Sequence, residues 1–251
     1  MKTIVLANQK GGVGKSTIAT HLAMAFHEKN NRVLFIDLDT QANSTKTLLK
    51  SGCISSLLSS QLFLNNDLSF RSENTITLIA ADIKLADLER ADVAVISYFK
   101  RQLHNLKDHF DYCVIDTPPT LGIRMTSALI AADFVLSPIE LEEYSIDGVH
   151  QMLQTIYGVK QKWNLNLQFL GMLANRFNAR SEIQKGNILK LLEDYAHLII
   201  PARISMRSSI PEALASGLPV WQLKKTAARE AAKEFQDAFN LIFEKMETIA
   251  A

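Results

Sequence analysis

The segment KGGVGKST, residues Lys10–Thr17, decides the fold of this chain. An apolar run, Thr3–Ala7, precedes the segment, and a stretch of helical periodicity, Ser16–Glu28, begins inside it. Glycines let successive backbone N–H groups turn inward around phosphate oxygens, and the start of a helix presents its positive end to the same anion. The order of strand, glycine-rich loop, lysine and helix therefore predicts a phosphate-binding P-loop.

Each residue type in this loop has a defined chemical task. Lys15 reaches the β- and γ-phosphates of a nucleoside triphosphate, and the Ser16 hydroxyl takes Mg²⁺. The predicted cofactors are ATP and Mg²⁺, and the predicted nucleotide ligands are Gly11, Gly12, Val13, Gly14, Lys15, Ser16 and Thr17. Gln9 replaces the first glycine of the usual pattern, and an additional lysine, Lys10, follows it. From the residues alone, Lys10 is either a solvated surface charge or a phosphate ligand that acts across a dimer interface.

Short apolar runs alternate with helical periodicity, and several runs are continuously apolar, as buried parallel strands are. The predicted strands are Thr3–Ala7, Arg32–Ile36, Thr75–Ile79, Tyr112–Ile115, Phe134–Leu136, Leu167–Leu173 and Leu198–Ile200. The predicted helices are Ser16–Glu28, Ala94–Leu106, Ser145–Tyr157, Ile183–Tyr195 and an amphipathic Thr226–Met246. The Ser55–Phe70 stretch is poorly periodic, and we expect a small helix and a loop over the nucleotide site there. The pattern predicts one α/β domain over residues 1–251, a doubly wound, mostly parallel sheet flanked by helices.

The composition is that of an ordinary globular protein, because 47% of the residues are apolar, 21% are charged and the formal net charge is +1. The two cysteines, Cys53 and Cys113, lie far apart in the sequence. This spacing argues against a disulfide framework or a cysteine-rich metal site, and it favours a reducing, cytoplasmic compartment. The N-terminus has no secretory pattern, and no run approaches the roughly 18 apolar residues that span a membrane.

Three aspartates follow predicted strands. Asp37 and Asp39 come after the second predicted strand, and Asp116 comes after the fourth. Ligands of open α/β sheets bind outside the carboxyl ends of the strands, where these side chains would lie. Asp116 fits the Walker B carboxylate that holds Mg²⁺, and Asp39 is the catalytic candidate that orients the attacking water. Asp37 is either a further metal ligand or a residue that acts indirectly, and one of the pair could instead cap a helix near Thr45–Leu49.

Taken together, these motifs resemble the ParA/MinD family of deviant Walker A ATPases, within the SIMIBI class of P-loop proteins. The matching segments are Lys10–Thr17 (KGGVGKST), Asp37–Asn43 (DLDTQAN), Tyr112–Pro119 (YCVIDTPP) and Ala131-Ala132-Asp133. The resemblance implies an ATP-dependent sandwich homodimer in which the signature lysine, Lys10, reaches the partner's phosphates as a catalytic residue. It also implies that Asn175 contacts adenine. Thr40 stands where the family usually has proline, and we expect a slightly looser loop there.

Within the family, the chain is most similar to small ParA-type partition ATPases. This resemblance implies an ATP dimer that binds DNA non-specifically at the nucleoid, with weak hydrolysis that a ParB-type centromere-binding protein stimulates to drive plasmid or chromosome segregation. Because the first predicted strand starts almost at once, we expect no N-terminal helix-turn-helix. Residues 201–233 hold six basic and two acidic side chains, a net charge of +4, which suits DNA phosphates but also an ordinary solvated surface. The candidate DNA-binding residues are Arg203, Arg207, Lys224, Lys225 and Arg229.

Three other functions fit the sequence less well. A MinD-like or cargo-positioning ATPase that acts on a membrane would need a basic amphipathic C-terminal helix, whereas Glu244–Ala251 holds two acids and one lysine, so we expect no membrane partner. An iron–sulfur reductase of the nitrogenase-iron-protein type needs cysteines that bridge two subunits, but Cys113 lies inside a predicted strand and Cys53 has no suitable partner. A binding module without activity would not need the complete set of hydrolytic residues that the chain carries.

Overall fold

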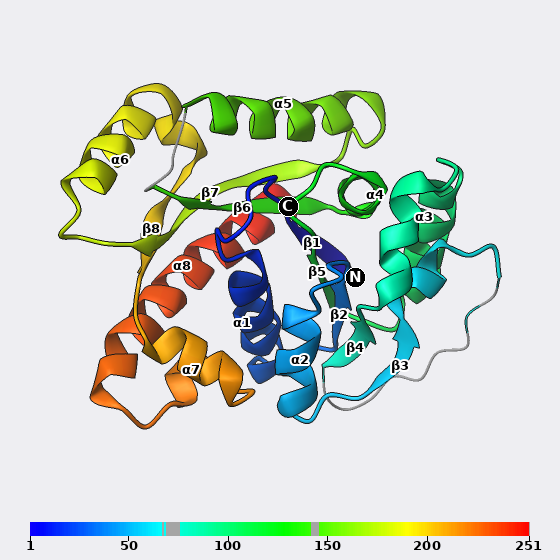
Figure 1. Ribbon diagram of the computed structural model, residues 1–251, viewed down its shortest axis with the longest axis horizontal. Coiled ribbons are helices and arrows are strands. Elements are labelled where there is room, and N and C mark those ends of the chain that lie inside the picture. The colour runs from blue at the N-terminus through cyan, green and yellow to red at the C-terminus, as the bar shows by residue number, and fades with distance from the viewer. Residues whose placement is uncertain (67, 69–75, 142–145, 251) are drawn as a thin grey trace.

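The computed structural model describes residues 1–66, 68, 76–141 and 146–250. These residues form an eight-stranded sheet and the helices that flank it (Figure 1). The strands are β1 (Lys2–Leu6), β2 (Val33–Asp37), β3 (Ser55–Leu58), β4 (Thr77–Ala80), β5 (Tyr112–Asp116), β6 (Phe134–Glu140), β7 (Gln168–Phe177) and β8 (Ile199–Ser205). Their order is β3-β4-β2-β5-β1-β6-β7-β8, and all neighbouring strands run parallel. The sheet grows outward from β1 in both directions, so the predicted doubly wound topology is confirmed.

The predicted strands are all present, although β6, β7 and β8 run further at their carboxyl ends than the sequence indicated. Thr75, the first residue of one predicted strand, lies outside the described residues. The expectation of a small helix and a loop over Ser55–Phe70 is wrong at its start, because β3 occupies Ser55–Leu58 and a 3-10 helix, η1 (Ser59–Phe63), follows it; Phe70 also lies outside the described residues. β3 is a four-residue edge strand that pairs with β4, so its conformation depends on a distant partner and not on local periodicity.

Helices cover both faces of the sheet. They are α1 (Lys15–Glu28), α2 (Asn43–Lys50), α3 (Val95–Leu106), α4 (Ile123–Ala131), α5 (Ile146–Lys162), α6 (Glu182–Tyr195), α7 (Ser209–Ala215) and α8 (Thr226–Ala250), with further 3-10 helices η2 (Ile83–Arg90), η3 (Ala196–Leu198) and η4 (Val220–Gln222). Figure 1 shows α5 on one side of the sheet and α1 and α8 on the other. The predicted helices are confirmed, except that Ser145 lies outside the described residues. The helix expected near Thr45–Leu49 is α2, whereas the sequence missed α4 and α7, which are short.

Two apolar clusters, one on each face, form the core. Strand β1 contributes side chains to both clusters. Val5 belongs to the cluster under α3, α4 and α5, and Ile4 and Leu6 belong to the cluster under α1, α7 and α8. The predicted apolar face of α8 is confirmed, since Phe235, Phe239, Ile242 and Met246 are buried and Phe243 packs against them. No helix among the described residues is long and apolar enough to cross a membrane.

His21 ties α1 to the C-terminal elements. Its ring is fully buried and stacks on Phe235 at a centroid distance of 4.3 Å. The Val220 N–H donates to Nε2 (3.2 Å), so Nδ1 carries the proton and donates to the Thr17 carbonyl (2.8 Å). Burial lowers the pKa of His21 to about 4, and the hydrogen bond to Thr17 only partly opposes this shift. The neutral ring therefore fixes the helix that follows the loop against α8 and η4.

Candidate active site

The glycine-rich loop leaves β1 at the centre of the sheet and leads into α1. Gly14, the residue before α1, has φ +87°, a left-handed conformation that favours glycine. A Cβ at this position would also lie 2.0 Å from Nδ2 of Asn175, so the backbone and the space both require glycine. No side chain of the described residues caps α1 at Gly14, which leaves the first N–H groups of the helix open to an anion.

Lys15 is buried at the start of α1, and its ammonium donates to the carbonyl of Lys10 across the loop (3.0 Å). Burial lowers the pKa of the Lys15 amine below its ordinary value, while the nearby carboxylates of Asp116 and Asp39 oppose that shift. The structure thus brings the predicted phosphate lysine close to two of the three candidate aspartates, Asp116 and Asp39. A cation held in this way is preorganised for a polyphosphate.

Asp116 ends β5 and is fully buried. Its Oδ2 accepts a hydrogen bond from the Ser44 hydroxyl (2.7 Å), whereas Oδ1 has no hydrogen-bond partner among the described residues. Burial, followed by the neighbouring Asp37 carboxylate, raises the pKa of Asp116 to about 7, and the adjacent Ser16 hydroxyl opposes the shift. A buried carboxylate oxygen without a partner, next to a serine hydroxyl, is the donor set that Mg²⁺ prefers. The residues present therefore fit the predicted metal.

Asp37 lies beside Asp116 on the neighbouring strand, but its oxygens already have partners. Oδ2 accepts hydrogen bonds from the N–H (2.9 Å) and the hydroxyl (2.7 Å) of Thr45, and Oδ1 accepts one from the Asp39 N–H (3.0 Å). Burial raises the pKa of Asp37, against the effect of these hydrogen bonds. Of the two roles that the sequence allowed, the structure favours the indirect one, in which Asp37 organises the Asp39 segment at the start of α2.

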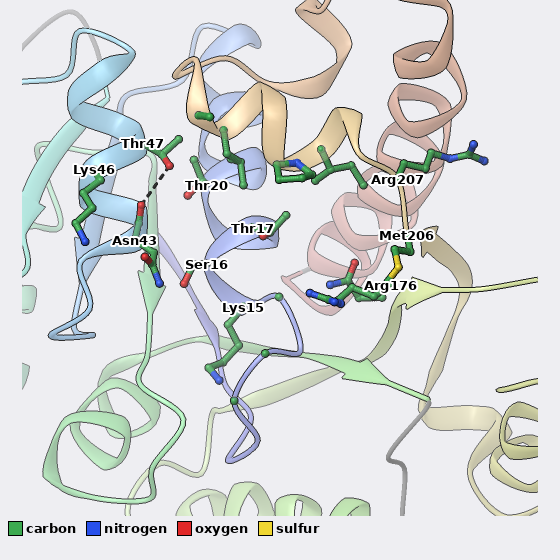
Figure 2. Close-up of a pocket in the computed structure, with 18 of the residues that line it drawn as sticks. Lys15, Ser16, Thr17, Thr20, Asn43, Lys46, Thr47, Arg176, Met206 and Arg207 are labelled. Atoms are coloured by element: carbon green, nitrogen blue, oxygen red, sulfur yellow. Dashed lines mark hydrogen bonds between the residues drawn. The ribbon is translucent and has the colours of Figure 1, made fainter. Parts of the chain in front are cut away.

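A cavity of about 800 Å³ opens beside the loop. Figure 2 shows Lys15, Ser16 and Thr17 at its centre, with side chains of α2 on one side and side chains from the ends of β7 and β8 on the other. Asp39 lines the cavity, so the predicted catalytic carboxylate and the phosphate-binding loop share one space. This volume is within the range of small-molecule and cofactor sites.

Lys10 lies outside this cavity. It lines a second cavity of about 310 Å³ together with Val149 and Met152 of α5 and Glu140 of β6. Its backbone N–H donates to Asn8 Oδ1 (2.9 Å), and its carbonyl accepts from Lys15. The structure therefore brings the backbone of Lys10, but not its side chain, to the phosphate site of its own chain.

Asn175 lines the large cavity from the end of β7 and is buried. Its Nδ2 donates to the carbonyl of Val13 (2.8 Å), so the amide clamps the glycine-rich loop. The predicted contact with adenine stays a prediction, and the loop contact is an additional role that sequence reasoning missed. The next residue, Arg176, was also missed; it has φ +55°, pairs with Glu140 (3.0 Å) and lines the same cavity.

The five candidate DNA-binding residues differ in their surroundings. Arg203, Lys224 and Arg229 are exposed, and Arg203 lies 4.7 Å above the ring of Phe177. Arg207 instead lines the large cavity and pairs with two carboxylates of α8, Glu230 (2.6 Å) and Glu234 (3.2 Å). Lys225 pairs with Glu212. The net charge counted over residues 201–233 overstated the free positive charge, because Glu234 stands one position beyond that segment.

A family model described as an AAA domain matches residues 1–169. The chain is 43% identical over 254 residues to Protein IncC of Escherichia coli, an alignment that covers 98% of this chain and 70% of that protein. These sequence matches agree with the motif arrangement around the loop and the two strand-end aspartates.

Two solved structures share the fold. A plasmid partition protein from Borrelia burgdorferi bound to AMPPNP superimposes with a TM-score of 0.77 at 26% identity, covering 97% of this chain and 99% of that one. Cobyrinic acid a,c-diamide synthase from Mycobacterium smegmatis with bound ADP and magnesium gives a TM-score of 0.73 at 28% identity, covering 93% of each chain. The same fold thus serves more than one reaction, and the sequence match together with the loop and strand-end motifs decides the family. This chain belongs to the ParA/MinD family of deviant Walker A P-loop ATPases.

Proposed function

We propose that this protein is a ParA-like partition ATPase that binds and hydrolyses MgATP and moves DNA with the help of a ParB-type partner. The proposal rests on one observation: Lys15, Ser16 and Asp39 line the large cavity and the buried Asp116 lies beside Lys15 and Ser16, although these residues come from three different strand ends. Phosphoryl transfer to water requires a cation for the phosphates, a metal site and an oriented water molecule. This set of residues supplies all three.

Ser16 and Asp116 would hold Mg²⁺, whose chemistry is to neutralise charge on the phosphate oxygens. Lys15 binds the β- and γ-phosphates together with the backbone N–H groups of the loop. Asp39 accepts a hydrogen bond from the attacking water and orients it toward the γ-phosphate. The solved structures of the two similar proteins contain AMPPNP in one case and ADP with magnesium in the other, which supports ATP and Mg²⁺ as the cofactors.

Lys10 would act in the partner subunit. Its side chain lies away from the phosphate site of its own chain, so a phosphate contact requires a second copy of the chain that faces the loop. Such a contact makes the dimer depend on the bound triphosphate, because the γ-phosphate then carries charge that both subunits neutralise. The signature lysine therefore converts nucleotide state into oligomeric state.

The ATP-bound dimer would bind DNA at the nucleoid without reading its sequence. Arg203, Lys224 and Arg229 are the residues to which we now assign the phosphate contacts, since they are exposed and Arg207 and Lys225 are engaged by carboxylates. Contacts of this kind are independent of sequence and weaken steeply with salt. Stimulated hydrolysis by a ParB-type protein would then release the DNA.

Substitution of the signature lysine tests the dimer. Sedimentation velocity with a non-hydrolysable ATP analogue and Mg²⁺ is expected to show wild-type dimers, and monomers with ADP. Lys10→Ala is expected to stay monomeric with the analogue while it still binds nucleotide, because Lys15 and the loop of its own chain are intact. The control is Lys107→Ala, an exposed lysine just past the end of α3, which should dimerise as the wild type does. A Lys10→Ala protein that dimerises with wild-type affinity would rule out the bridging role.

A further inference from the structure

Arg124 stands where a cation is electrostatically unfavourable, in the first turn of α4. The positive end of a helix repels a cation, and the sequence of α4, IRMTSALIA, is otherwise uncharged. The Arg124 side chain is nevertheless almost buried, with 8% of it exposed. A charge in such a place persists only where strong contacts compensate for it.

Two contacts hold the Arg124 guanidinium. Nε donates to Oε1 of Glu89 in η2 (2.7 Å), and one terminal nitrogen donates to the carbonyl of Leu38 (3.1 Å). The second oxygen of Glu89 accepts the N–H of Ile123 (2.9 Å) and so caps α4, which no side chain at Gly122 could do. A Cβ at position 122 would lie 1.8 Å from this oxygen, so glycine leaves room for the carboxylate.

Leu38 is the residue between the two aspartates of the DLD segment, and both of its backbone polar groups are fixed. Its N–H donates to the carbonyl of Asp116 (2.9 Å), and its carbonyl accepts from Arg124. Asp39 follows directly, and its own N–H is held by Asp37. The direction of the Asp39 side chain therefore depends on a peptide that is held from β5 on one side and from α4 on the other.

We propose that Arg124 is a positioning residue for hydrolysis. Its hydrogen bond to the Leu38 carbonyl orients the Asp39 side chain, and Glu89 in turn holds Arg124 in place. The inference rests on the proposed function, because it concerns the step that Asp39 performs. Arg124 links the segment after Asp116 to the segment after Asp37. A movement of α4 therefore changes the orientation of the Asp39 side chain without a change in the phosphate-binding loop. Nucleotide affinity and turnover are thereby separable.

The test compares steady-state MgATP hydrolysis in wild type, Arg124→Met and Arg124→Lys, with turnover normalised to the number of nucleotide-binding sites found by titration. Arg124→Met is expected to lower kcat by about 10- to 100-fold, because Asp39 loses its orientation, and to leave KM within about twofold. The kcat of Arg124→Lys is expected to lie between those of the wild type and Arg124→Met, since one ammonium cannot reach both Glu89 and the Leu38 carbonyl in the geometry of the guanidinium.

Arg32→Gln is the matched control. Arg32 pairs with Asp111 (2.8 Å) and joins the same two strands, β2 and β5, at their opposite ends. The Arg32→Gln substitution should change kcat by less than about twofold, because it removes only an exposed ion pair. If Arg124→Met lowered only the thermal unfolding temperature and the number of active sites, with kcat per site unchanged, Arg124 would be merely structural and the inference overturned. A wild-type protein that bound no MgATP would instead overturn the proposed function itself.

Discussion

Replacement of Lys15 by alanine is expected to weaken the binding of MgATP by about 100-fold. The lysine ammonium is held at the loop near Asp116 and Asp39, and it is the only cation of α1's first turn. Loss of about two charge-assisted hydrogen bonds to phosphate oxygens removes about 3 kcal/mol, or about 100-fold in Kd. Isothermal titration of the variant with a non-hydrolysable ATP analogue and Mg²⁺ measures this change directly.

Lys46 provides the control for this substitution. It lines the same cavity from α2, but its side chain is exposed and its ammonium donates to the Gln41 carbonyl (2.9 Å). Lys46→Ala should therefore change Kd by less than about threefold. Thermal unfolding of both variants checks that the buried position of Lys15 does not by itself cause misfolding. Retention of wild-type affinity by folded Lys15→Ala would contradict the assignment of this loop as the phosphate site.

Replacement of Asp39 by alanine is expected to separate binding from turnover. Asp39 is half-buried in the cavity, and its Oδ1 accepts the Gln41 N–H (3.0 Å), so the carboxylate is already oriented. Removal of an oriented carboxylate is expected to reduce turnover by about 100-fold or more. Affinity for MgATP should stay the same or rise, because one negative charge near the phosphates is lost. The variant should accumulate as an ATP-bound dimer, visible by sedimentation and by the unhydrolysed nucleotide recovered from it.

Asp87→Ala is the control for the loss of one carboxylate, because Asp87 is an exposed residue of η2. It is expected to hydrolyse ATP at the wild-type rate. A hydrolysis rate for Asp39→Ala equal to that of Asp87→Ala would exclude Asp39 from water positioning. The remaining candidate would then be Asp37, although its oxygens are engaged by Thr45 and the Asp39 N–H.

Local sequence predicted the parts of the site that lie within single segments. The loop, its helix and the aspartates at the strand ends follow from glycine placement and from the rule that ligands bind at the carboxyl ends of parallel strands. The doubly wound topology followed from the alternation of apolar strands and helices. These features depend on residues that are close in sequence, which is why they could be read without a structure.

Features that depend on long-range contacts could not be read in this way. Glu89 and Arg124 meet across 35 positions, and the Asn175 amide reaches Val13 across 162 positions. Arg207 was expected at a DNA surface because the charge count stopped before Glu234, which pairs with it from the next turn of α8. The Arg124 contacts had no usable local signal, because α4 itself was not predicted; only with the helix known does an arginine in its first turn stand out as a position that the helix dipole disfavours.

We expect the bound nucleotide to control the contact of this protein with DNA phosphates. Binding to a random-sequence duplex should be measured with a non-hydrolysable ATP analogue, with ADP and without nucleotide, over a series of salt concentrations. We expect binding only with the analogue, and three contacts from each subunit of a dimer predict a slope of log K against log salt of about −5. Combined substitution of Arg203, Lys224 and Arg229 by alanine should remove this binding and leave hydrolysis intact. Equal binding with ATP analogue and ADP, or no binding by a protein that hydrolyses ATP, would contradict nucleotide control of DNA binding.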